Sequence, residues 1–199
     1  MKKIMFSEKF GLEQAVLAGT KDMTRRDGAK VMFQYEIDRG LGSLQEKNGR
    51  KETLEEYAIR KSPYKVGDIV AVAQRYADIP VDCLPDSPFS LEVFAEHQGW
   101  SNKMYVCADL MPHRIKITGV RFEQLKCISD EECIREGIYA RNDVIDTDMR
   151  DIVCYQYYGT PSMFRSPRDA FASLINKMCG AGMWEANRFV YVYSFKLVR

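Results

Sequence analysis

The sequence has few of the residues that bind metal ions or form disulfide frameworks. Its six cysteines include no C-x-x-C pair, and only His97 and His113 supply imidazole groups. Zinc sites need cysteine and histidine ligands at close spacing. We therefore expect no metal and no cofactor, and we interpret the cysteines as reduced and mostly buried small apolar residues.

Long apolar runs are also missing. No uncharged apolar stretch approaches the roughly 20 residues that a membrane span requires. The first residues have the charged start of a signal peptide, but Glu8 and Lys9 interrupt them before an apolar core develops. We therefore expect a cytoplasmic protein that does not bind membranes.

The chain has no strong excess of either charge. Its formal net charge is +1, so any binding of nucleic acid must come from a local basic patch. Hydrophobic residues make up 46% and charged residues 29%, which excludes a wholly disordered chain. We find no internal repeat, and 199 residues favour a single domain over 1–199.

Local patterns predict both strands and helices, and therefore an α+β protein. Strands are expected over 3–6, 69–72, 114–122 with a bulge near Gly119, and 188–198; helices over 8–18, 52–61, 129–137 and 166–180. Three stretches without clear periodicity, at about 38–51, 77–103 and 139–165, are expected to be irregular insertions. The polar stretch 20–28 is expected to form an exposed loop.

Four residues of this polar stretch offer groups that bind anions. Lys21, Thr24, Arg25 and Arg26 supply an ammonium, a hydroxyl and two guanidinium groups, with few acids close in sequence. Such groups can hold a phosphate, a carboxylate or a polarised carbonyl by charge-assisted hydrogen bonds. The alternative is a solvated polar loop whose own two aspartates neutralise it.

Six motifs follow one another in a characteristic order. They are Lys21-x-x-Thr24-x-Arg26, Tyr64-x-Val66-Gly67-Asp68, Met111-Pro112-x-x-Ile115-x-Ile117, Ile128-Ser129-x-Glu131 to Glu136-Gly137-Ile138, Phe171-x-x-Leu174-Ile175-Asn176 and Trp184-Glu185-x-Asn187. The motifs are distributed over nearly the whole chain. In this order they resemble the ASCH domain family, a branch of the PUA-like barrels, especially its bacterial and phage members.

The resemblance implies a small mixed β-barrel of about five to six strands with flanking helices. It also implies a cleft, lined by the segment with Lys21, that binds RNA or a nucleotide. We expect Gln74, Arg75 and Tyr76, which follow the strand 69–72, to line the same cleft. Further candidates for this cleft are Trp100, His113 and Arg114.

Two other functions remain open. One branch of the family resembles an amidohydrolase that removes the acetyl group of N4-acetylcytidine, which would make Lys21 and Thr24 catalytic. That branch has a glutamate where this chain has Gln74, and an amide cannot exchange a proton near pH 7; Glu36 or Glu185 would have to replace it. The last alternative is a phage-related interaction protein that docks a protein partner through 77–103 and 139–165.

Overall fold

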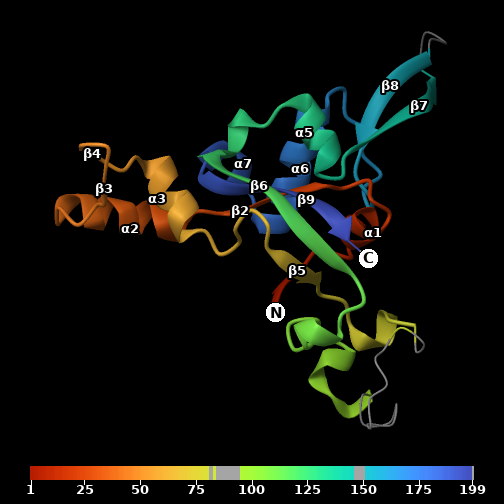
Figure 1. Ribbon diagram of the computed structural model, residues 1–199. Coiled ribbons are helices and arrows are strands. Elements are labelled where there is room, and N and C mark those ends of the chain that lie inside the picture. Colours follow the sequence, from red (N-terminus) through yellow and green to blue (C-terminus); the bar gives the residue numbers. More distant parts are fainter. Residues whose placement is uncertain (81–82, 84–94, 146–150, 199) are drawn as a thin grey trace.

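The computed structural model describes residues 1–80, 83, 95–145 and 151–198 (Figure 1). Its helices and strands in chain order are β1 (Lys2–Ile4), α1 (Leu12–Leu17), β2 (Met23–Asp27), α2 (Ala29–Gly40), β3 (Glu46–Lys47), β4 (Arg50–Lys51), α3 (Leu54–Lys61), β5 (Ile69–Val72), β6 (Arg114–Gln124), α5 (Asp130–Arg135), β7 (Tyr139–Ile145), β8 (Asp151–Gln156), α6 (Pro167–Cys179), α7 (Met183–Ala186) and β9 (Phe189–Val198). Short 3-10 helices lie between β5 and β6 and directly after β6.

A five-stranded mixed sheet forms the centre of the protein. Its strand order is β1-β5-β6-β9-β2, and only the pair of β1 and β5 is parallel. The register of β6 against β9 shifts between Ile117 and Gly119, which confirms the predicted bulge. Two hairpins, β3-β4 and β7-β8, stand apart from this sheet (Figure 1). The predicted α+β class is confirmed.

The sheet is not closed into a barrel, which differs from the closed structure that the resemblance implies. Its edges are β1 and β2, and no backbone hydrogen bond joins them among the residues described. A side chain spans the gap instead, because Arg26 Nη2 on β2 donates a hydrogen bond of 2.6 Å to the carbonyl oxygen of Met5, next to β1. We call this gap between β1 and β2 the seam.

The core lies on both faces of β9. Five of its residues, Val190, Tyr191, Val192, Tyr193 and Phe195, are at most 5% exposed, as predicted for a strand buried on both sides. Burying a large apolar side chain contributes about 1.5–3 kcal/mol, so this strand stabilises the fold strongly.

Helix α6 covers the seam. It begins as the sequence predicts, since the Ser166 hydroxyl accepts a hydrogen bond from the backbone N–H of Asp169 and Pro167 occupies the first helical position. Its buried face includes Phe171 and Leu174, which join the main core.

The predicted loop at 20–28 is wrong. Residues Met23 to Asp27 form β2, an edge strand paired antiparallel with β9 from Ser194 to Val190. Met23 and Thr24 are buried. Charged side chains normally indicate solvent exposure, but Arg25 pairs with glutamates that lie far away in the sequence, and the local pattern does not reveal those partners.

Two regions without sequence periodicity are regular. Residues 29–40 form α2, which buries no residue and carries the exposed apolar side chains Phe33 and Ile37; the exposed Leu41 follows the helix directly. The stretch 139–165 contains the hairpin β7-β8, although residues 146–150 lie outside the described part. The stretch 77–103 is described only in part, because 81–82 and 84–94 fall outside it.

The prediction that most cysteines are buried is also wrong. Cys133 and Cys154 are buried, whereas Cys83, Cys107, Cys127 and Cys179 are exposed. All six are free thiols.

Candidate functional site

A small pocket lies in the seam. From one side Met5, Phe6 and Ser7 line it, and from the other side Lys21, Thr24, Arg25 and Arg26, with Leu12, Glu136 and the α6 residues Phe171, Leu174, Ile175 and Met178 completing the wall. Its volume is about 50 Å³. The structure therefore places four of the predicted site residues at one pocket.

Lys21 is fully buried in this pocket. Its ammonium group donates hydrogen bonds to the Glu136 carboxylate at 2.6 Å and to the Glu136 carbonyl oxygen at 2.7 Å. Burial lowers the pKa of Lys21, and the adjacent carboxylate of Glu136 opposes that effect only in part. Lys21 is thus a buried amine whose two hydrogen bonds both go to Glu136.

Arg25 is occupied by carboxylates. Its guanidinium forms ion pairs with Glu123 at 2.9 Å, Glu132 at 2.5 Å and Glu136 at 3.1 Å. The side chain is 2% exposed. Because three acids that are distant in the sequence surround it, Arg25 organises the fold and has little capacity to bind the anionic ligand for which the sequence made it a candidate.

Arg26 is the cation of the pocket that pairs with no carboxylate among the described residues. Its Nη2 bonds to Met5, its guanidinium lies 5.4 Å from the centre of the Phe6 ring, and its buried Nε has no hydrogen-bond partner. Burial lowers the pKa of Arg26, yet an arginine remains protonated at neutral pH. A buried, unsatisfied N–H of this kind favours an acceptor oxygen.

Thr24 contributes a hydroxyl group. The residue is 5% exposed and pairs with Tyr193 of β9 in the sheet. Within the described residues its hydroxyl forms no hydrogen bond. It can therefore donate to, or accept from, a group that enters the pocket.

Gln74, Arg75 and Tyr76, which were expected in the same cleft, do not line the seam pocket. Gln74 is buried, and its Oε1 lies 2.7 Å from Nδ1 of His113. Arg75 forms ion pairs with Asp78 and Glu8 at the surface. Neither Gln74 nor Arg75 forms a hydrogen bond or an ion pair with Lys21.

Tyr76 is a core residue rather than an exposed wall. It is 3% exposed, packs in a second apolar cluster against Trp100, and its hydroxyl accepts a hydrogen bond from the backbone N–H of Cys107. Arg114 has a buried Nε without a partner, but it does not line the seam pocket.

Glu136 is the pocket residue that the sequence reasoning missed. It follows α5 and lies 115 positions from Lys21 along the chain, so no local pattern joins the two. The other proposed acids are elsewhere: Glu36 pairs with Arg39 on the surface, and Glu185 accepts a hydrogen bond from Asn176. The one sequence feature that could have indicated Glu136 is the Glu136-Gly137 pair, which is part of a motif of the resemblance.

Comparisons of the chain with protein-family models, with curated proteins and with solved structures found no match. Within the ranges described above, no group of three or more histidine, cysteine, aspartate or glutamate side chains is arranged to hold a metal ion. In the same ranges, no helix has the length and apolar character to cross a membrane.

Proposed function

We propose that the protein is an RNA- or nucleotide-binding module of the ASCH type, and that the seam pocket receives a polar group of the ligand. The observation that carries this proposal is Arg26, a partly buried arginine at the pocket whose Nε atom is buried and has no hydrogen-bond partner. An anionic or carbonyl oxygen is the natural acceptor for such a donor.

The size of the pocket limits what enters it. A volume of about 50 Å³ admits a few atoms, since a water molecule occupies roughly 30 Å³ in the liquid. A phosphate or carbonyl oxygen fits this description, whereas a complete nucleoside does not. The remainder of the ligand would lie outside the seam, on neighbouring surface.

The arrangement of the sheet supports a PUA-like relationship. Five strands form one mixed sheet whose two edges come within the reach of a single arginine side chain. The segment with the Lys21 motif borders the pocket, which is where the resemblance expects the ligand cleft.

A salt titration tests this function. Wild-type protein should bind cytidine monophosphate or a short single-stranded RNA at low salt and lose affinity as salt rises. Arg26→Met should weaken binding about 10- to 100-fold, the effect of losing a hydrogen bond to a charged group. Arg39→Met, which removes a surface arginine of α2, is the matched control. Absence of binding at low salt would remove the proposal.

One observation favours a second candidate, an amidohydrolase acting on an acylated nucleoside. Lys21 and Thr24 share the pocket with the Glu136 carboxylate, which supplies an acid-base group that Gln74 cannot. In this reaction water would cleave the amide C–N bond of N4-acetylcytidine and release acetate and cytidine.

Incubation with N4-acetylcytidine decides this second candidate. We compare wild-type protein with Glu136→Gln and Gln74→Glu and measure released cytidine. Glu136→Gln should lower the rate about 100- to 10,000-fold if that carboxylate moves a proton. Release of cytidine by neither wild type nor Gln74→Glu would rule out the hydrolase.

A further inference from the structure

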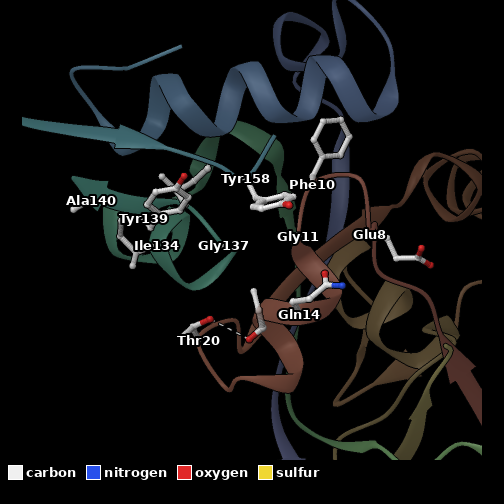
Figure 2. A pocket seen from close by; sticks show the side chains of 12 residues that line it. Glu8, Phe10, Gly11, Gln14, Thr20, Ile134, Gly137, Tyr139, Ala140 and Tyr158 are labelled. Atoms are coloured by element: carbon white, nitrogen blue, oxygen red, sulfur yellow. Dashed lines mark hydrogen bonds between the residues drawn. The ribbon is translucent and has the colours of Figure 1, made fainter. Parts of the chain in front are cut away.

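A second and larger cavity, of about 630 Å³, lies between α1 and the start of the β7-β8 hairpin (Figure 2). Its wall is mainly apolar and includes Ala15 of α1 and Ala140 of β7. Ligand pockets typically measure roughly 300–1,000 Å³ and combine apolar walls with a few polar groups. The cavity therefore has the dimensions of a site for a flat organic ring.

An exposed tyrosine is held in place at this cavity. Tyr158 is 63% exposed, yet its side chain rests directly on the backbone of Gly11, above which its ring lies in Figure 2. A Cβ atom at Gly11 would stand 2.8 Å from Tyr158 Cβ and Cγ, and Gly11 has a φ of +62°. Glycine at this position thus lets the aromatic ring sit flat against the chain.

Two further side chains complete the site. Tyr139, at the start of β7, is 42% exposed and presents a second aromatic surface to the cavity. Gln14 projects from α1, is exposed, and forms no side-chain hydrogen bond within the described residues. An amide offers both a donor and an acceptor, the combination that recognises the edge of a nucleobase.

The cavity adjoins the seam pocket along three stretches of chain. Gly11, Thr20 and Gly137 line the cavity, and the residues next to them in sequence, Leu12, Lys21 and Glu136, line the seam pocket. The wall between the two is thin, since a Cβ on Gly137 would meet Leu12 Cδ2 at 2.9 Å. A ligand that is too large for the seam pocket can therefore place its remaining atoms in the adjacent cavity.

We propose that the larger cavity binds a nucleobase, which stacks on Tyr158 and is read at its edge by the Gln14 amide. This inference rests on the proposed function for the class of ligand, but it concerns a separate site. Stacking on an aromatic side chain accepts every base, while the amide provides selectivity among them. The base belongs either to a free nucleotide or to a single-stranded RNA, which share this chemistry.

Methyl NMR distinguishes the two sites in one titration. The methyl groups of Ala15 and Ala140 report on the cavity, and those of Met5 and Met178 report on the seam pocket. With cytidine monophosphate, we expect ring-current shifts at both alanine signals. Ribose 5-phosphate, which lacks the base, should leave the alanine signals unmoved. A short single-stranded RNA in place of the mononucleotide shows which source of the base binds more tightly.

Variants establish the role of the stacking residue. Tyr158→Ala should weaken binding of cytidine monophosphate roughly 5- to 150-fold, whereas Tyr158→Phe should retain it. Tyr105→Ala, which removes a tyrosine that is 52% exposed and does not line the cavity, should have no effect.

The outcomes separate the two proposals. Shifts confined to Met5 and Met178 would overturn the nucleobase site and leave the seam pocket as the ligand site. Shifts confined to Ala15 and Ala140 would support the nucleobase site and contradict the role of the seam. Unchanged signals at all four methyl groups would overturn both. Equal affinities of wild type and Tyr158→Ala would overturn stacking.

Discussion

Arg26 Nη2 donates a 2.6 Å hydrogen bond to the carbonyl oxygen of Met5, and so connects the two edge strands of the central sheet. The bond holds the guanidinium across the seam, where its central carbon lies 5.4 Å from the centre of the Phe6 ring. The same geometry leaves Nε buried without a partner. One arginine therefore joins the strands and supplies the donor of the candidate site.

The ion pairs of Arg25 predict a large loss of stability on truncation. Arg25→Ala should lower the free energy of unfolding by about 3–5 kcal/mol, because three glutamates lose a buried cation. Arg121 pairs with two of the same glutamates but is 47% exposed, so Arg121→Ala should cost at most about 1 kcal/mol. Urea unfolding at pH 7 measures both variants. Equal losses would contradict the structural role of Arg25.

Acid should destabilise the protein through Glu132. Burial disfavours the carboxylate, but hydrogen bonds from Arg25 and Arg121 outweigh burial and hold the pKa of Glu132 below its ordinary 4.5. The resulting stability is complete above pH 4.5 and is lost as the pH falls through the folded-state pKa. Urea midpoints at pH 7 and pH 3 should therefore differ less in Glu132→Gln than in wild type. An unchanged difference would show that Glu132 does not contribute.

The contact of Gln74 with His113 predicts a titration shift. Burial lowers the pKa of His113 in the wild-type protein. Gln74→Glu would place a carboxylate 2.7 Å from Nδ1 and should raise that pKa by about 1 to 3 pH units. NMR titration of the two histidines measures this, with His97 as the internal control. An unmoved His113 would mean that the two side chains do not meet.

The contact between Tyr158 and Gly11 predicts different losses of stability for two glycine-to-alanine substitutions. Gly11 and Gly19 both have positive φ, but an added Cβ clashes with Tyr158 only at Gly11 and meets nothing within 4 Å at Gly19. Each alanine variant should lose roughly 1 kcal/mol from backbone strain. Gly11→Ala should lose more, because the tyrosine must move. Thermal unfolding measures the stability of both variants. Equal losses of stability in Gly11→Ala and Gly19→Ala would contradict a Tyr158 ring held against Gly11.

Much of the fold follows from local signals in the sequence. The hydroxyl caps of α5 and α6 and the β-branched run of β5 each specify their element over a few residues. The sequence did not reveal β2 as a strand, because its charged residues find partners far away in the chain. Helix α2 was missed because its apolar residues show no clear helical period in the sequence, and in the structure the helix buries none of them.

The candidate site was only half predictable. Lys21, Thr24 and Arg26 share a motif, and adjacency in sequence was enough to place them together. Glu136 and the α6 residues of the pocket belong to the second half of the chain. Tertiary packing brings them next to Lys21, Thr24 and Arg26, so local sequence patterns do not predict it. Gln74 was assigned through the resemblance, yet its hydrogen bond goes to His113 and it does not line the pocket.

A crystal structure of the protein with cytidine monophosphate tests the central claim most directly. We predict an oxygen atom of the nucleotide in the seam pocket, within hydrogen-bond distance of Arg26 Nε and near the Thr24 hydroxyl. A nucleotide bound on another face, with no ligand atom near Arg26 Nε, would contradict the account.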